Sequence, residues 1–298
     1  MLSAPITTKA ATAGLFELAR RAPFNIAPER AESLASEIFG SGKWSIAASE
    51  TEANFYAVAE DRVIYLSYAG LASLWCLAFA AFHLMDIASR RQRMQHPAHQ
   101  THIDIGDHFT AMRLGEYVAY ARSLFHTNAA WPSNLVTPKV DALLDSEDGR
   151  INNLFFGALS WVMLHEIGHV HHRDERLIPI GQRIRQEYRA DGFATKWILD
   201  GAGQGLKREF RVLMISVALT WLFMNEAELG RGSTHPPAIL RFRETIQHFK
   251  TGQRSVGLEN AAYLFKAVLD PLTSPPVQQT PENSFEWICS RIEKIFPA

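Results

Sequence analysis

The chain has 298 residues, of which 47% are hydrophobic and 20% charged, and its 30 Lys and Arg residues nearly balance its 31 Asp and Glu residues. The hydrophobic fraction excludes a disordered or fibrous protein, and the balanced charge gives no reason to expect a nucleic-acid partner, because phosphate-binding surfaces carry a basic excess. Only two cysteines occur, Cys76 and Cys289, so no disulfide framework is expected and a reducing, cytoplasmic location is predicted.

Helix signals open the chain. Thr7 and Thr8 are suited to cap a first helix that continues through Arg21. Pro28 favours the first turn of a second helix, and the run Gly40-Ser41-Gly42 predicts its end. The N-terminal part of the chain, over 7–40, is therefore expected to be helical.

Three strand-like segments follow, at 43–48, 54–58 and 63–66. The last two are rich in β-branched and aromatic residues and are separated by a short polar turn, which suits a β-hairpin. We expect these segments to form one small antiparallel sheet.

An uncharged run from Val63 to Met85 is long enough to cross a bilayer. Its first residues, Val63, Ile64 and Tyr65, favour a strand instead. We therefore predict that the strand leads into a buried helix at about 69–91, and a membrane span over 63–85 is the alternative.

Helical spacing of apolar residues dominates the rest of the chain. A His- and Gln-rich connector at 92–102 and a loop at 128–138 interrupt it. Helices are expected at 107–127, 151–173, 181–200, 205–228, 236–250, 257–269 and 281–296. The predicted fold class is predominantly α, of the α+β kind, with one small sheet.

The most informative segment is an H-E-x-x-H motif, His165-Glu166-Ile167-Gly168-His169, at the end of an apolar run. On a helix the two histidines lie one turn apart on the same face, so their imidazoles can converge on one metal ion. Two imidazoles and a carboxylate suit zinc, which keeps its fourth position for water. Glu166 would lie beside that water as general base, because the metal brings the pKa of water toward about 7. An ordinary surface helix with two histidines is the alternative.

The following helix supplies a candidate third ligand. Glu187 and Asp191 are four residues apart and share one helical face. Glu187 would complete the coordination, and Asp191 would accept the outer N–H of a ligand histidine and fix its tautomer. Two alternatives stay open, namely a solvated acidic face paired with neighbouring arginines, and His172 as the third ligand.

The combination of H-E-x-x-H with a later E-x-x-x-D resembles the gluzincin metallopeptidases. The segment from Ser233 to Arg241, with the sequence STHPPAILR, is similar to the S-T-H-P-P-x-x-x-R segment of the HtpX and CAAX-prenyl-protease type, and the hairpin at 54–67 is similar to a strand pair of that group. The same residues also suit a simple helix start, with Thr234 as cap.

This resemblance implies a zincin-like helical metallopeptidase fold and roles for further residues. His235 would reach the active-site cleft, and Arg241 would support substrate binding or the developing oxyanion. The hairpin, with Val63, Ile64 and Tyr65, would offer an edge to an extended peptide. Size and layout are similar to the phage-exclusion (Lit-like) peptidases of bacteria, which implies cleavage of a translation elongation factor triggered by infection.

Together these features predict a zinc-dependent endopeptidase with one Zn²⁺ per chain, in which Glu166 deprotonates the zinc-bound water that attacks a protein or peptide substrate. A non-catalytic interaction or sensor protein stabilised by a metal is the alternative. We expect a single domain over 1–298, with a catalytic core at about 43–250 and flanking helices at 7–40 and 257–296. Because an unrestrained cytoplasmic protease would be toxic, the terminal helices are expected to cover the cleft until a regulatory partner moves them.

Overall fold

The computed structural model describes residues 5–40, 44–94, 110–175, 178–232, 235–252, 254–273 and 280–298. Its elements, in chain order, are α1 (Thr8–Ala19), α2 (Ala22–Ile26), η1 (Pro28–Arg30), α3 (Ala31–Ser33), η2 (Leu34–Ile38), β1 (Ser45–Ser49), β2 (Phe55–Val58), β3 (Val63–Ser67), α4 (Tyr68–Met94), α6 (Leu114–Ser123), α7 (Glu147–His172), α8 (Ile180–Leu199), α9 (Leu206–Leu229), α10 (Ala238–Ile246), α11 (Val256–Leu269) and α12 (Pro281–Ile295). The predicted fold class, predominantly α with a small sheet, is confirmed.

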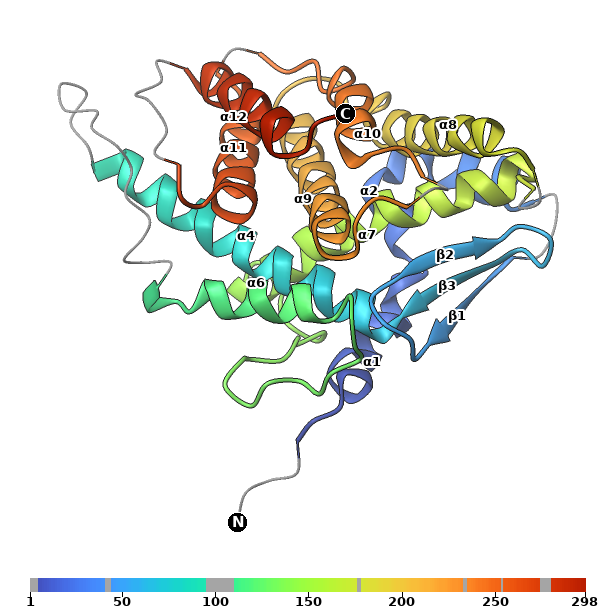
Figure 1. The fold of residues 1–298 in the computed structure, drawn as a ribbon, viewed down its shortest axis with the longest axis horizontal. Helices are drawn as coiled ribbons and strands as arrows, with labels where there is room; N and C mark the ends of the chain where they lie inside the picture. The colour runs from blue at the N-terminus through green and yellow to red at the C-terminus, as the bar shows by residue number, and fades with distance from the viewer. Residues whose placement is uncertain are drawn as a thin grey trace.

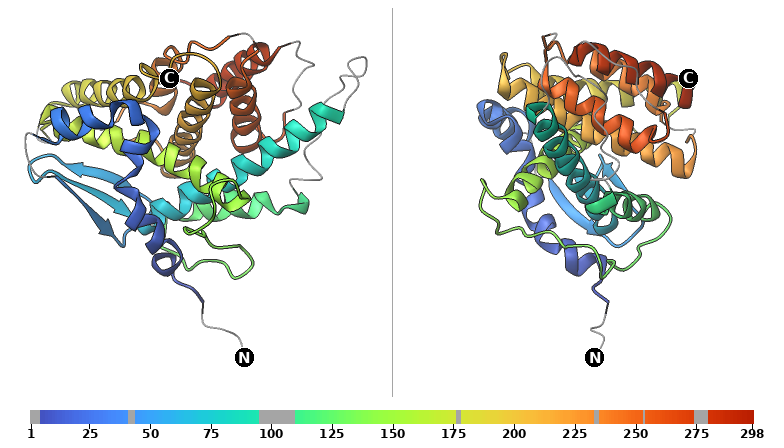
Figure 2. Two further views of the ribbon diagram at one scale, coloured as in Figure 1. Left: turned by 180° about the vertical axis from the view of Figure 1, so that it is seen from behind. Right: turned by 90° about the vertical axis from the view of Figure 1, so that its left-hand side faces the viewer.

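Helix α7 runs through the middle of the molecule and packs against α2, α4, α8, α9 and β2 (Figure 1). It is apolar on all sides along most of its length, as a helix enclosed by others must be. Trp161 and Phe155 are among its fully buried side chains. The sheet lies at one end of the molecule, beside α7, whereas α11 and α12 lie toward the opposite end (Figures 1 and 2). The H-E-x-x-H motif therefore lies in a central helix that is enclosed by neighbouring elements.

The three-stranded sheet has the order β1-β3-β2. Strand β3 pairs in parallel with β1, with Ser45 opposite Val63, and antiparallel with β2, with Phe55 opposite Leu66. The prediction of an antiparallel sheet is thus wrong for one of its two ladders, because the second strand of the hairpin inserts between β2 and β1. Both sides of β3 are paired, so Val63, Ile64 and Tyr65 do not form an open edge.

Helices α4, α7, α8, α9, α11 and α12 agree with the predicted ones to within four residues at either end, whereas α6 is much shorter than the helix predicted at 107–127, whose residues 107–109 lie outside the described ones. Thr7 caps α1 by accepting from the backbone N–H of Ala10. The second predicted helix differs, since it is broken into short turns after the additional helix α2. The predicted connector at 92–102 begins with the last turn of α4, and its remainder lies outside the described residues. Ser41 and Gly42, predicted to end the second helix, also lie outside them, as do Ser233 and Thr234.

Two described helical segments, Tyr68–Ile87 and Leu206–Leu229, are long and apolar enough to cross a membrane. In the structure, 78% and 67% of their most apolar windows are buried inside the molecule. A core helix meets the same criterion as a membrane span, so length and composition are weak evidence here. The predicted alternative span over 63–85 begins with strand β3 and not with a helix.

Candidate metal centre and active site

Helix α7 carries both histidines of the motif to a point where α8 crosses closely. A Cβ atom added to Gly168 would lie 3.3 Å from the Ala190 Cα and 3.3 Å from the Phe193 ring, so glycine is what permits this approach. About two helical turns before Gly168, the Trp161 indole N–H donates to Thr195 Oγ1 at 3.0 Å and ties the two helices together. The close approach brings the face of α8 that carries Glu187 over the histidines.

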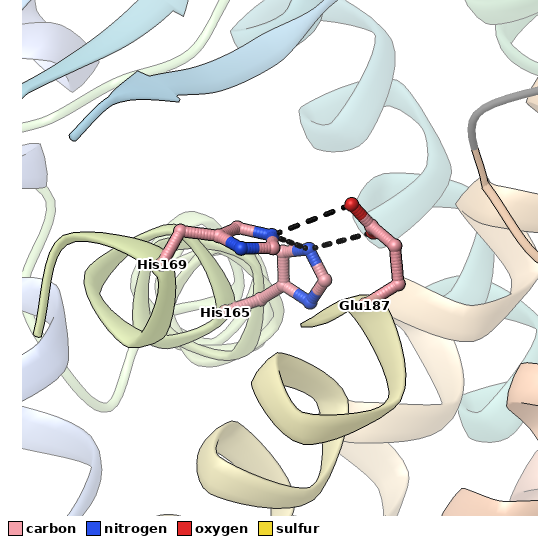
Figure 3. Close-up of side chains that lie close together, drawn as sticks. All are labelled: His165, His169 and Glu187. Carbon is pink, nitrogen blue, oxygen red and sulfur yellow. Dashed lines mark hydrogen bonds and ion pairs between the residues drawn. The ribbon is translucent and has the colours of Figure 1, made fainter. Parts of the chain in front are cut away.

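Three side chains converge at this crossing, His165 and His169 from α7 and Glu187 from α8 (Figure 3). The two Nε2 atoms are 3.1 Å apart. Glu187 Oε1 lies 3.5 Å from His169 Nε2, and Glu187 Oε2 lies 3.4 Å from His165 Nε2. Ligands held at about 2.0–2.1 Å from a tetrahedral zinc ion are about 3.3 Å apart. The spacing of the three donors therefore fits one such ion.

Glu187 also shows the need for a cation. Its side chain is about nine-tenths buried, and Oε2 makes no hydrogen bond within the described part of the chain. A buried carboxylate oxygen without a partner is costly, and a metal ion at the centre of the three donors would satisfy it. The donor set, two imidazoles and one carboxylate, is one of the sets that catalytic zinc sites use.

Behind the first histidine lies a buried ion pair. His165 Nδ1 donates to Asp191 Oδ1 at 2.9 Å, which leaves Nε2 directed at the convergence point. Arg241 donates to the same carboxylate through Nε at 2.8 Å and Nη2 at 2.7 Å. All three side chains are nearly inaccessible to solvent. A hydrogen bond from a ligand histidine to Asp191 is the contact predicted from the sequence, and the ion pair of Asp191 with Arg241 is an addition from the structure.

These contacts set the charges of the site. Burial alone would lower the pKa of His165, but the neighbouring carboxylates of Asp191 and Glu187 raise it to about 10. Burial opposes ionisation of Asp191 as well, and the adjacent Arg241 guanidinium nevertheless keeps the pKa of that carboxyl below its usual range. The pKa of Glu187 is also low, because His165 and Arg241 outweigh its burial. The carboxylates are thus ionised and ready to hold a cation.

Glu166, the second residue of the motif, is buried beside the convergence point. Burial raises the pKa of its carboxyl above the ordinary value, and the nearby histidines oppose that rise. The backbone of Ala57 donates a hydrogen bond to the Glu166 carboxylate. Because Ser67 N–H donates to Asn54 O, the alternation of an antiparallel pair turns the backbone groups of Phe55 and Ala57 away from β3. The edge of β2 therefore faces Glu166.

A cleft of about 300 Å³ opens next to these residues. It lies between α7, α9, α10 and the start of β2, and Glu166, His235 and Arg241 are among its lining residues. Much of its wall is apolar, including Phe55, Trp161, Val162, Trp221 and Leu222. The site is thus accessible from a groove large enough for a bulky side chain.

The remaining predicted residues lie at different distances from the centre. His235 is exposed, and its Nε2 lies 3.6 Å from Glu187 Oε1, so it borders the site. His172 is not among the converging donors in the described part of the chain, and its Nδ1 donates to the Gly168 carbonyl at 2.7 Å. Val63, Ile64 and Tyr65 lie in β3, one strand away from the edge that faces Glu166.

Asp174 belongs to the site and was not predicted. Its Oδ2 accepts from His169 Nδ1 at 2.8 Å, and its Oδ1 accepts from the Arg189 guanidinium. Asp174 lies beyond the end of α7, so the helical spacing that identified Asp191 gives no signal for it. The turn that brings Asp174 into contact with His169 depends on how helix α7 ends.

The sequence matches a family model described as Peptidase U49 over residues 64–261. It is also similar to the cell death peptidase of Escherichia coli (strain K12), with 25% identity over an alignment of 259 positions that covers 81% of this chain and 83% of that protein. No solved structure matches. All of the converging side chains and their buried partners lie within the segment that the family model covers.

Proposed function

The chain belongs to the peptidase U49 family, and from this premise we propose that it is a zinc-dependent endopeptidase that hydrolyses peptide bonds of a protein substrate. The observation that carries the proposal is the convergence of His165, His169 and Glu187 at the donor spacing of a tetrahedral metal site, directly beside Glu166. A site that only stabilised the fold would have no use for a buried carboxylic acid next to an open coordination position.

His165, His169 and Glu187 would hold the zinc ion. When bound, zinc polarises the scissile carbonyl and lowers the pKa of water toward about 7. The Glu166 carboxylate takes up a proton from the attacking water. Because burial raises the pKa of Glu166, this pKa lies closer to the neutral range in which a general base works efficiently. Glu166 then delivers this proton to the leaving amine. His235 stands at the open side of the cleft and is proposed to donate to the developing oxyanion.

Arg241 is proposed to act through the fixed Asp191–His165 contact. Its Nε and Nη2 are engaged by Asp191, and the side chain still borders the cleft. Direct support of the substrate or oxyanion by Arg241 is a second proposal, and it uses the part of the guanidinium that faces the cleft.

The substrate backbone is proposed to lie along β2. The outward backbone groups of Phe55 suit pairing with an extended substrate segment, which would then run toward Ala57 and its contact with Glu166. One substrate side chain would enter the cleft between Trp161 and Trp221. A protein substrate would have to present an extended, accessible segment to be cut.

Cytoplasmic action and control by a partner are further parts of the proposal. The similar protein of Escherichia coli is named a cell death peptidase. If cleavage by the present chain is comparably harmful, the activity must be restrained until it is needed, and a regulatory partner would supply that control.

The test measures zinc and cleavage on the same purified protein. Wild type and Glu166→Gln are expected to hold about one zinc per chain, while cleavage of a library of short unstructured peptides falls by about 10²–10⁴-fold in the variant. Glu175→Gln changes an exposed carboxylate at the end of the same segment and serves as the matched control. Equal cleavage by wild type and Glu166→Gln would refute the mechanism. Zinc binding without cleavage of any peptide by wild type would favour the non-catalytic alternative.

A further inference from the structure

Each of the two converging histidines has its Nδ1 atom bound to a carboxylate, but the two carboxylates come from different places in the fold. His165 uses Asp191 on α8. His169 uses Asp174, which follows the end of α7, at 2.8 Å. The Asp174 side chain is only 6% exposed. The second pair is therefore as close as the first, and it is largely shielded, with side chains 15% and 6% exposed against 7% and 3% in the first pair.

The end of α7 explains how Asp174 reaches back to His169. Arg173 adopts the left-handed conformation with φ 54°, and its N–H donates to Val170 O at 3.2 Å. The Asp174 N–H donates to His169 O at 3.0 Å. These are the two hydrogen bonds of a Schellman motif, in which the residue after the left-handed one touches the residue five positions before it. That contact is commonly apolar, whereas here it joins an imidazole to a carboxylate.

A cation from α8 holds the other oxygen of Asp174. Arg189 donates to Asp174 Oδ1, so the carboxylate bridges the end of α7 to α8. The arrangement repeats the one at His165, where Arg241 holds Asp191. The two arginines differ in exposure, since the Arg189 side chain is 46% exposed and that of Arg241 is 8% exposed.

We propose that Asp174 is a positioning residue for His169 and that the Schellman motif at the end of α7 is part of the metal site. Asp174 accepts a hydrogen bond from the Nδ1–H of His169, which holds the proton on Nδ1 and leaves the Nε2 lone pair directed at the metal position. Arg189 steadies the carboxylate from α8. This inference rests on the proposed function, because it assigns Asp174 a role at the proposed zinc site.

The experiment measures zinc affinity of the full chain by competition with a chromophoric chelator, and so needs no substrate. Removing an outer partner of a ligand histidine costs about 10–100-fold in metal affinity, and this loss is expected for Asp174→Ala. Asp174→Asn retains an acceptor and is expected to lose less. Asp148→Asn, in the first turn of the same helix and paired with Lys139 on the surface, is the matched control and should bind as wild type.

A second pair of variants leaves the carboxylate in the chain and changes only its placement. Arg173 is exposed and lies in the left-handed region, so Arg173→Gly should preserve zinc affinity while Arg173→Val, with a β-branched side chain, should weaken it. Thermal unfolding of each metal-free variant is recorded alongside. A purely structural role would lower the melting temperature of Asp174→Ala and leave the affinity of the folded protein unchanged.

Zinc affinity of Asp174→Ala within about twofold of wild type, when Glu187→Gln binds far more weakly, would overturn the inference and leave the proposed function intact. If Glu187→Gln and His169→Ala also bind zinc as wild type does, the metal site itself is wrong and both proposals fall.

Discussion

Arg241 donates a hydrogen bond to each carboxylate oxygen of Asp191, with Nε 2.8 Å from Oδ2 and Nη2 2.7 Å from Oδ1. The pair is almost wholly buried and stands directly behind the His165 ring. It therefore contributes to the fold and to the orientation of a proposed ligand at once, and the two effects can be separated by experiment.

Replacing Arg241 by Met should destabilise the metal-free protein by about 3–5 kcal/mol, because Asp191 is left as a buried charge without its cation. Arg243→Met is the matched control on the same helix. Arg243 pairs with Glu293 at 2.8 Å on the surface, with both side chains 43% exposed, and its loss should cost about 0–1 kcal/mol. Urea unfolding of both variants gives the comparison. Equal losses of unfolding free energy would mean that the buried pair stabilises the fold no more than the surface pair does.

Replacing Glu187 by Gln should remove most of the bound zinc, since the amide withdraws the anionic ligand. His172→Ala should retain zinc, because His172 lies outside the group of converging donors. Metal analysis of the purified proteins after dialysis against a weak chelator measures both. Loss of zinc in His172→Ala and its retention in Glu187→Gln would reverse the assignment of the third ligand.

Two glycines offer a test of the contact between α7 and α8. A Cβ atom at Gly192 would meet nothing within 4 Å, so Gly192→Ala should stabilise α8 by about 0.5–1 kcal/mol. At Gly168 the added methyl group would press against the Ala190 backbone at 3.3 Å. Gly168→Ala should therefore gain less stability than Gly192→Ala, or lose it, and should weaken zinc binding as the helices separate. Chemical unfolding and chelator competition report the two effects, and identical behaviour of the variants would contradict the proposed role of the close approach.

A third ion-pair cluster predicts a dependence of stability on pH. Arg211 holds Glu29 at 2.6 Å and Lys207 adds a contact at 2.9 Å. Hydrogen bonds from Arg211 outweigh burial and, with those from Lys207, lower the pKa of Glu29 from 4.5 to about 2. Because the folded-state pKa is lowered, this stabilisation is complete above about pH 4.5 and is lost as the pH falls toward 2.

Glu29→Gln should accordingly be less stable than wild type near neutral pH, and the difference should shrink between pH 4.5 and 2. Glu52→Gln, at an exposed position, is the control. The measurement is urea unfolding at a series of pH values. A difference that stays constant through this window would show that the Glu29 carboxylate is not stabilised by its partners.

The sequence predicted the central features of the site because they depend on local periodicity. His165 and His169 share a face of any helix, as do Glu187 and Asp191, so their alignment needs no knowledge of the fold. The pairing of the two faces was an inference from chemistry, and the structure brings His165, His169 and Glu187 together.

Other features depend on contacts that no local pattern specifies. Whether 63–66 is a central or an edge strand is decided by where β1 docks, which is why the edge that faces Glu166 belongs to β2 and not to β3. The partner of Arg241 lies 50 residues away in sequence. Asp174 depends on a left-handed arginine at the end of α7, and residues other than glycine seldom adopt that conformation.

The proposed ligands all lie on α7 and α8, which are consecutive in the chain, whereas Arg241, which binds Asp191, lies on α10. In the denatured chain His165, His169 and Glu187 stay close along the sequence, so the unfolded ensemble retains some affinity for metal. A ligand that binds both states stabilises the native state by less than its affinity for the folded protein implies. The rise in melting temperature on adding zinc should therefore be smaller than the zinc dissociation constant alone would suggest.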